Sequence, residues 1–286
     1  VDANILFLAR VPRIILAALS GAALSVAGAV FQSLLRNDLA APFTLGVSSG
    51  AALGAVIAMS LGLSYTVAGI PTVPIAAFLG ALGAITLVFS LARTRTGEFP
   101  TSVLLLAGVT ANFFFAAMVM LIHYLSDFTQ SFRIVRWLMG GLDITSYQTL
   151  LSISPMIIIG FATLMFISRD LNVISTGIQA AMSRGVEVIK IQKIGFVMAS
   201  LLTGAVVAIS GPIGFVGLIV PHIVRLMVGP DLRILLPASI FFGASFLILC
   251  DTLARTIIAP TEIPVGIITA MLGGPFFVWL LKRSKN

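Results

Sequence analysis

Nine long apolar segments follow one another along the chain, and few folds can accommodate them. They lie near residues 12–34, 44–63, 70–92, 101–124, 148–167, 191–209, 212–229, 234–254 and 264–281. A helix needs about 20 consecutive apolar residues to cross the hydrocarbon core of a bilayer. The segments therefore predict an all-α polytopic membrane protein with about nine transmembrane helices.

Charged residues are too scarce to cover a water-exposed surface. Of the 286 residues, 59% are hydrophobic and 9% are charged, whereas soluble domains carry roughly 25% charged residues. The mean hydropathy is +1.13, and no hydrophilic domain separates the apolar segments. We therefore expect a single membrane domain over residues 1–286.

The boundary between the segments 191–209 and 212–229 depends on one short stretch, Ser210-Gly211-Pro212. Proline removes a backbone donor and clashes with the preceding turn, and glycine loosens a helix. We expect the helix to break at this stretch.

The positive charges favour one orientation in the membrane. With the N-terminus outside, twelve of the 17 Lys and Arg residues fall on the inner side and the other five outside. The outer cations are Arg10, Arg13, Arg133, Arg136 and Arg255. Every lysine is inside. Cytoplasmic loops carry the excess of Lys and Arg, so we expect this orientation.

The ten acidic residues fall in loops or at the ends of the apolar segments. A charge at the centre of a bilayer costs about 2.5–3.5 kcal/mol, and ion-driven carriers accept this cost because the buried carboxylate couples the ion to transport. We expect no buried carboxylate here, with Asp251 as the one that a substrate-lined cavity could hide. A secondary transporter is therefore disfavoured.

Motifs for nucleotide binding and metal binding are missing from the sequence. It contains no G-x-x-x-x-G-K-[ST] phosphate loop and no H-E-x-x-H. Cys250 is the single cysteine, which excludes a disulfide within the chain and fits no metal-ligand spacing. No run of Lys and Arg points to nucleic acid. We therefore expect no enzyme, no cofactor or metal site, and no nucleic-acid partner.

Several distinctive motifs lie within and between the apolar segments. They are R-V-P-R at 10–13, Q-S-L-L-R-N-D-L-A-A-P at 32–42, L-G-V-S-S-G-A at 45–51, W-L-M-G-G at 137–141, G-F-V-G-L-I-V-P-H-I-V-R at 214–225, D-L-R at 231–233, A-R at 254–255 and E-I-P-V-G-I at 262–267. Together they closely resemble the FecCD family, the membrane permeases of ABC importers for ferric siderophores, haem and cobalamin. The resemblance runs from about Arg10 to Lys282, and the motif at 214–225 is highly specific.

The resemblance implies a permease subunit of an ATP-driven importer (ABC type II) that carries a metal chelate. Similar permeases form homodimers around a central pathway. A cytoplasmic ATPase dimer powers them, and a periplasmic or lipid-anchored substrate-binding protein delivers the cargo. By family frequency a ferric siderophore comes first, then haem and cobalamin, and a small oxyanion such as molybdate stays open.

The expected location is the bacterial or archaeal cytoplasmic (inner) membrane, with lipid around a multi-pass chain. The alternative from another functional class is a stand-alone secondary carrier or channel. Family members begin with a further membrane helix before the R-[LV]-P-R motif, and this sequence does not. With that helix restored, the N-terminus would be cytoplasmic, in agreement with the orientation derived from charge. A truncated N-terminus is the explanation we favour.

The inner loop at 168–190 matches in position the family's coupling helices, which dock on the ATPase. Its candidate coupling residues are Gly177, Ile178, Ala181, Met182 and Gly185. The family commonly has Gly-Glu where this chain has Gly177-Ile178, which favours apolar docking through Ile178 and Met182. With Ile174 these two side chains form an apolar i, i+4, i+8 stripe, and this disfavours the alternative of a solvated connector.

Thr101 and Ser102 follow Glu98-Phe99-Pro100 at the start of an apolar segment, and by motif they match the family's cytoplasmic gate beside the dimer axis. Small hydroxyl side chains suit a constriction that must seal and then open. The alternative is a helix N-cap, because Ser and Thr are favoured there in any case. The sequence leaves both interpretations open.

Arg10, Arg13 and Arg255 match family positions that pair with carboxylates on the two lobes of the substrate-binding protein. Arginine suits this role because its rigid fork grips a carboxylate through two hydrogen bonds, whereas lysine offers a point charge. The alternative is snorkelling to lipid headgroups at the interface. Glu262 or Asp251 could also neutralise Arg255 within the chain, which would leave two docking arginines.

Overall fold

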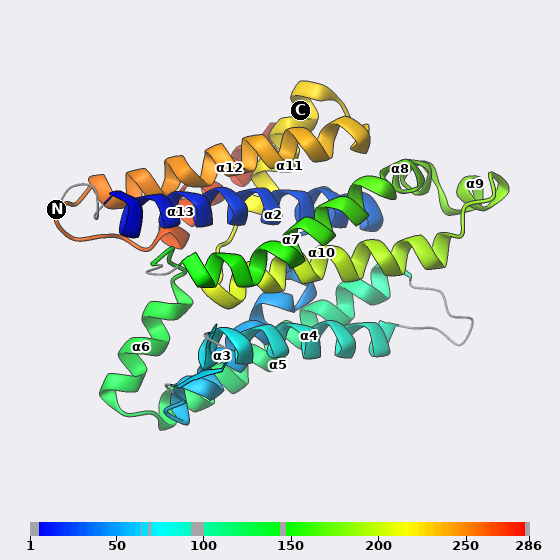
Figure 1. The fold of residues 1–286 in the computed structure, drawn as a ribbon. Helices are drawn as coiled ribbons and strands as arrows, with labels where there is room; N and C mark the ends of the chain where they lie inside the picture. The colour runs from blue at the N-terminus through cyan, green and yellow to red at the C-terminus, as the bar shows by residue number, and fades with distance from the viewer. Residues whose placement is uncertain (1–5, 64, 68–69, 93–99, 144–146, 284–286) are drawn as a thin grey trace.

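The computed structural model describes residues 6–63, 65–67, 70–92, 100–143 and 147–283, and helices make up nearly all of it (Figure 1). The helices are η1 (Leu6–Arg10), α2 (Val11–Leu35), η2 (Pro42–Leu45), α3 (Val47–Ser60), α4 (Thr72–Ala92), α5 (Thr101–Leu125), α6 (Phe128–Leu138), α7 (Tyr147–Phe166), α8 (Ser168–Thr176), α9 (Ile178–Ser183), α10 (Val188–Ser210), α11 (Val216–Val228), α12 (Leu232–Thr256) and α13 (Val265–Arg283). Two short strands, β1 (Thr66–Val67) and β2 (Ile70–Pro71), pair antiparallel. The expected all-α architecture is confirmed.

Six helices in the described part of the chain are long and apolar enough to cross a membrane. They are η1 joined to α2, then α4, α5, α7, α10 and α12. The other apolar segments form the shorter helices α3, α11 and, over Val265–Val278, α13. Each predicted segment is therefore helical, but the expected count of nine spans is not confirmed, since six of the described helices reach spanning length.

Helix α2 is the core of the bundle. Every residue from Ser20 to Leu35 is buried, and a helix that is apolar all round is enclosed by other helices. Helices α10, α11 and α12 pack directly against α2, and Figure 1 shows α12 running alongside it over most of its length. The first predicted span is therefore shielded by protein over most of its surface.

Close packing in the bundle depends on glycine at the crossing points. Helix α2 meets α12 at Gly21 and Gly243, where a Cβ on either residue would overlap atoms of the opposite helix. Helix α3 meets α4 in the same way at Gly50 and Gly80. Small residues let helix backbones approach closely in lipid, where no hydrophobic drive brings helices together. These glycines therefore determine which helices pair.

The predicted break between the segments 191–209 and 212–229 is confirmed. Helix α10 ends at Ser210, and Gly211 (φ +66°) begins a non-helical stretch before α11. The Gly141 N–H donates to the Ser210 carbonyl at 2.8 Å, and the Gly266 N–H donates to the Gly140 carbonyl at 3.3 Å. The segment after α6 therefore contacts the end of α10 and the start of α13 through backbone hydrogen bonds.

Helix α6 is not predicted by the apolar segments, because it is short and polar on one side. Asp127 caps it by accepting a hydrogen bond from the Gln130 N–H at 2.8 Å. Ile134 is fully buried, whereas Arg133 and Arg136 are exposed. The helix therefore packs one apolar side on the bundle and presents cations on the other.

The two ends of the bundle carry different elements (Figure 1). The start of α2, helix α6 and the connection from α12 to α13 lie at one end, and α8 and α9 lie at the opposite end. The positive charges predict that the first end faces outside and the second faces the cytoplasm. We call them the outer end and the inner end in this expected orientation.

Candidate functional site

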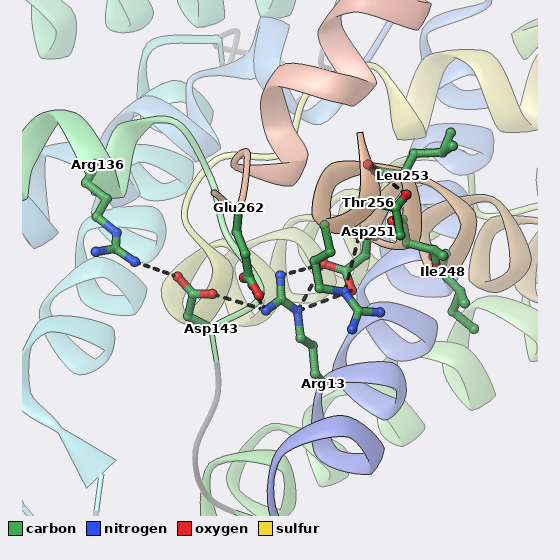
Figure 2. A network of polar contacts seen from close by, with 10 residues as sticks. Arg13, Arg136, Asp143, Ile248, Asp251, Leu253, Thr256 and Glu262 are labelled. Atoms are coloured by element: carbon green, nitrogen blue, oxygen red, sulfur yellow. Dashed lines mark hydrogen bonds and ion pairs between the residues drawn. The ribbon is translucent and has the colours of Figure 1, made fainter. Parts of the chain in front are cut away.

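Six charged side chains from distant parts of the sequence form an ion-pair cluster at the outer end (Figure 2). They are Arg13 (α2), Arg136 (α6), Asp143 (after α6), Asp251 and Arg255 (α12) and Glu262 (between α12 and α13). We call this group the outer cluster. Its three arginines and three carboxylates balance one another in charge.

Arg13 is the centre of the outer cluster. Its Nε and Nη2 donate to the Asp251 carboxylate at 3.0–3.2 Å, and its Nη1 donates to Glu262 Oε2 at 2.7 Å. Asp143 Oδ1 lies 3.5 Å from the same Nη1. The Arg13 side chain is 15% exposed, so its guanidinium is enclosed among three carboxylates.

Asp251 contradicts the expectation that no carboxylate is buried. It is 2% exposed, although it lies about one and a half turns from the C-terminal end of α12. Arg13 chelates it, and Arg255 Nε lies 3.1 Å from its Oδ2. A buried charge is tolerated where close partners offset its desolvation. Two arginines of the same chain neutralise this one.

The three carboxylates differ sharply in exposure. Asp251 is enclosed, whereas the side chains of Glu262 and Asp143 are 51% and 58% exposed. Asp143 also pairs with Arg136 at 3.3 Å, and that pair is open to solvent. Ion pairs in water contribute about 0–1 kcal/mol. The Arg13–Asp251 pair is therefore the permanent part of the cluster, and the pairs made by Glu262 and Asp143 are readily exchanged.

A cavity of about 530 Å³ opens beside these exchangeable carboxylates. Arg13, Arg136, Asp143 and Glu262 line it together with side chains that include the apolar Pro264. Opposite charges and apolar groups thus face the same space. Such a surface suits a contact with another protein that brings charged groups of its own.

The three predicted docking arginines lie near one another at the outer end but are not equivalent. Arg10 is exposed and makes no ion pair with any residue that the structure describes. Arg13 and Arg255 share the Asp251 carboxylate. Neutralisation of Arg255 within the chain, which the sequence left open, is therefore observed, and Arg13 is neutralised as well. Docking itself stays a prediction.

The predicted coupling segment forms two short helices, α8 and α9. Gly177 has φ +149° and separates α8 from α9. Ile174 is buried at 1% exposure, whereas Ile178 and Met182 are 39% and 48% exposed. The predicted stripe across these three side chains is wrong, because the chain turns at Gly177 and directs Ile174 into the core.

The remaining coupling candidates also divide between core and surface. Ala181 is fully buried, so it supports α9 from within. Gly185 is exposed and has φ +79°, a conformation that favours glycine. Ile178 and Met182 are therefore the apolar candidates for a contact with a partner, and they lie on the projecting helix α9 at the inner end (Figure 1).

Helix α8 is joined to the start of α12 through one side chain. Asn172 Nδ2 donates to Asp231 Oδ1 at 2.6 Å, and Asn172 Oδ1 accepts from the Leu232 N–H at 2.8 Å. Asp231 also caps α12 by accepting from the Arg233 N–H at 3.0 Å. Hydrogen bonds from the Arg233 side chain and backbone, and then from Asn172, hold the pKa of the Asp231 carboxyl well below its usual value.

A second ionic contact at the inner end ties α11 to the end of α2 and the segment after it. Arg225, in the last turn of α11, pairs with Asp38 and donates to Gln32 Oε1 at 3.0 Å. Both partners belong to the motif at 32–42, and Arg225 ends the motif at 214–225. These two motifs therefore meet in space and secure α2 to α11.

Thr101 and Ser102 are the first two residues of α5. Thr101 is half-buried and lines a small pocket with Leu34 and Leu104, whereas Ser102 is exposed. The N-cap position belongs to Pro100, whose side chain makes no capping hydrogen bond. Glu98 and Phe99 lie outside the described residues. The N-cap alternative is therefore wrong, because Pro100 holds that position, and the gate role stays a prediction.

A bundle of apolar helices whose described ion pairs lie at its two ends is typical of a polytopic membrane protein. The sequence of this chain matches the FecCD transport family over residues 1–283. The chain belongs to that family, and the resemblance stated from the motifs is confirmed.

Relatives of known name cover nearly the whole chain. The ABC transporter permease protein YvrB of Bacillus subtilis is 45% identical over 99% of this chain and 80% of its own length. The hemin transport system permease protein HmuU of Yersinia pestis is 41% identical over 97% of this chain and 83% of its own. The cobalamin import system permease protein BtuC of Halobacterium salinarum is 44% identical over 96% and 73%.

A solved structure has the same fold. It is described as an inward-facing conformation of a transporter of the metal-chelate ABC type. It superimposes with a TM-score of 0.90 at 32% sequence identity, and the match covers 99% of this chain and 88% of that one. The arrangement of α2 to α13 is therefore the arrangement found in a transporter of this type.

Proposed function

We propose that this chain is the membrane-spanning permease subunit of an ATP-driven ABC importer for a metal chelate. The observation that carries the proposal is the match to a metal-chelate ABC transporter along 99% of the chain with a TM-score of 0.90. The sequence contains no phosphate loop of its own. A partner subunit therefore hydrolyses ATP, and this chain provides the route.

The cargo is a ferric siderophore in our proposal, with haem and cobalamin next. Relatives of the chain include permeases for hemin, cobalamin, Fe(3+)-citrate and iron(3+)-hydroxamate. All four cargoes are organic chelates that enclose a metal. ATP-dependent uptake into proteoliposomes that hold the assembled importer distinguishes them, when a ferric hydroxamate, hemin and cyanocobalamin are offered in turn. If the importer takes up none of these chelates, the proposed cargo class is wrong.

The working assembly in this proposal contains two copies of the chain, a cytoplasmic ATPase dimer and a substrate-binding protein outside a bacterial or archaeal cytoplasmic membrane. The exposed apolar side chains of α9, Ile178 and Met182, are offered to the ATPase at the inner end. Gly177 and Gly185 allow the turns that make α9 project, and the buried Ala181 holds it in place. In this proposal α9 is a short projecting helix that contacts the ATPase.

Docking of the substrate-binding protein is assigned to the arginines of the outer end. Arg10 is the strongest candidate, because it is exposed and makes no ion pair within the described residues. Arg13 and Arg255 border the same surface from α2 and α12. Replacing Arg10 by Ala should weaken binder association, most at low ionic strength, because exposed charges act chiefly through long-range attraction. Snorkelling to lipid would leave the affinity unchanged.

Thr101 and Ser102 are assigned to the inner gate. They are the first two residues of α5, at the expected cytoplasmic side, and Ser102 is exposed. Cysteines placed at 101 or 102 should crosslink between the two copies and block transport. Absence of crosslinking in every nucleotide state would show that the gate lies elsewhere.

The alternative is a carrier or channel that works without an ATPase. Proteoliposomes with the permease alone and with the complete importer separate the two functions. We expect uptake only with ATP and the ATPase present. Uptake by the lone chain would overturn the proposed class.

A further inference from the structure

Carboxylates around Arg13 accept hydrogen bonds from all three of its guanidinium nitrogens. Nε and Nη2 face Asp251, and Nη1 faces both Glu262 and Asp143. The side of the guanidinium that carries Nε is inaccessible to a partner, because Asp251 binds it and is only 2% exposed. A carboxylate that arrives from outside therefore reaches Arg13 from the other side, where Glu262 now binds Nη1.

Glu262 is well placed to be displaced from Arg13. Its side chain is 51% exposed, and it belongs to the non-helical connection between α12 and α13. A solvent-exposed pair exchanges its partner at little cost in free energy. The pair to Asp251, by contrast, is enclosed, and breaking it would leave a buried charge without a partner.

The outer cluster offers little net attraction to an acidic partner while Glu262 is in place, because its three carboxylates balance its three arginines. Arg10 and Arg133 add positive charge at the same end, and both are exposed. These two cations can attract a carboxylate from solution. On arrival it meets Glu262 as the competitor for Arg13 Nη1.

We propose that Glu262 is a built-in competitor of the docking partner: a carboxylate of the substrate-binding protein takes the place of Glu262 on Arg13 Nη1. The inference rests on the proposed docking function. Arg13 stays paired before and after the exchange, so neither state leaves a half-buried cation alone. The exchange keeps docking weak and reversible, which suits a substrate-binding protein that must dissociate after each delivery of cargo.

The test measures affinity between the assembled importer in lipid nanodiscs and the substrate-binding protein encoded beside its permease gene. Glu262→Gln should raise this affinity roughly two- to fivefold at low salt, because it removes a competing exposed charge. Asp143→Asn should give a smaller gain, since Asp143 lies farther from Nη1 than Glu262 does, at 3.5 Å and 2.7 Å.

Asp127→Asn is the matched control. It removes the same charge from the same end, at the start of α6, and asparagine caps a helix about as well as aspartate. It should leave the affinity close to that of the unchanged chain. If this control raises the affinity equally, the total charge of the outer end is responsible, and the proposed exchange of carboxylates on Arg13 is wrong.

A loss of affinity, or no change, in a folded Glu262→Gln variant would also overturn the proposal. Should that variant fail to assemble, Glu262→Asp keeps the charge but shortens the reach to Arg13, and it should also raise the affinity. Arg10→Ala separates this inference from the docking function. If Arg10→Ala weakens docking and Glu262→Gln does nothing, the exchange alone fails; if neither variant has an effect, both proposals fail.

Discussion

Asn172 and Asp231 join the inner segment to one of the long helices: Asn172 Nδ2 donates to Asp231 Oδ1 at 2.6 Å, while Asn172 Oδ1 accepts from the neighbouring Leu232 N–H at 2.8 Å. Asn172 lies on α8 and Asp231 caps α12. Helix α12 has 25 residues and is therefore roughly 37 Å long. Its far end carries Asp251 and the outer cluster, so one helix connects the two ends.

We predict that Asn172→Asp uncouples the importer, because it brings two carboxylates into contact. Binder-stimulated ATPase activity and transport should fall, while basal ATPase activity is retained. The exchange variant Asn172→Asp with Asp231→Asn restores an amide–carboxylate pair and should recover part of the coupling. Ser175→Ala on the same helix is the control, since the Ser175 hydroxyl donates to the Asn172 carbonyl within α8. A merely structural role would lower basal ATPase activity together with the stimulated activity in the Asn172→Asp variant.

Charged replacements on α9 should separate the permease from its ATPase. Ile178→Asp with Met182→Asp places two charges where exposed apolar side chains are proposed to pack. We expect loss of co-purified ATPase while the permease still inserts in the membrane. Gln179→Asp is the control, because Gln179 is exposed on the same helix. Full ATPase stimulation in the double variant would contradict the coupling role.

Arg13→Ala should destabilise the fold more than Arg10→Ala. It removes the chelating partner of the buried Asp251 and leaves that carboxylate with Arg255, a loss we place at about 1–3 kcal/mol. Arg10 makes no ion pair with the described residues, and its replacement should stay within about 0.5 kcal/mol. Unfolding curves of the purified variants in detergent check the difference. Equal losses would contradict the assignment of Arg13 to the permanent pair.

Gly243→Ala should loosen the contact between α12 and α2. The new Cβ would overlap Ser25 Oγ and lie 2.5 Å from the Gly21 carbonyl oxygen, and overpacking of this kind costs about 1–3 kcal/mol. Gly83→Ala is the control, because nothing in the described structure lies within 4 Å of a Cβ there. The same unfolding measurement should show a loss for Gly243→Ala and none for Gly83→Ala.

The Asp231 carboxyl gives a prediction about pH. Its pKa is lowered in the folded chain, first by hydrogen bonds from Arg233 and then from Asn172. A group with a lowered pKa stabilises the fold above its ordinary pKa, and this contribution is lost as the pH falls through the lowered value. The difference in stability between Asp231→Asn and the unchanged chain should therefore be constant from about pH 5 to pH 8. A change within this range would contradict the ionised contact.

Local patterns in the sequence were sufficient to predict the helices and the family. Each apolar segment became a helix because burial of apolar side chains and internal backbone hydrogen bonding act over neighbouring residues. The break at Ser210-Gly211-Pro212 was predictable for the same reason. Helix α6 was not, since it is short and its apolar side is narrow, and the turn at Gly177 depends on a backbone angle that no pattern of side chains reveals.

The contacts among the charges, by contrast, could be learned only from how the helices pack. Arg13 and Asp251 are 238 positions apart, and no spacing rule connects them. Their contact follows from the packing of α2 on α12 at Gly21 and Gly243, which sets the register between the two helices. Composition alone requires that such a chain cross a membrane, because its apolar segments cannot face water. Helix packing determines that one buried carboxylate holds two of the three predicted docking arginines, because ionic contacts form only where the backbone brings opposite charges within reach.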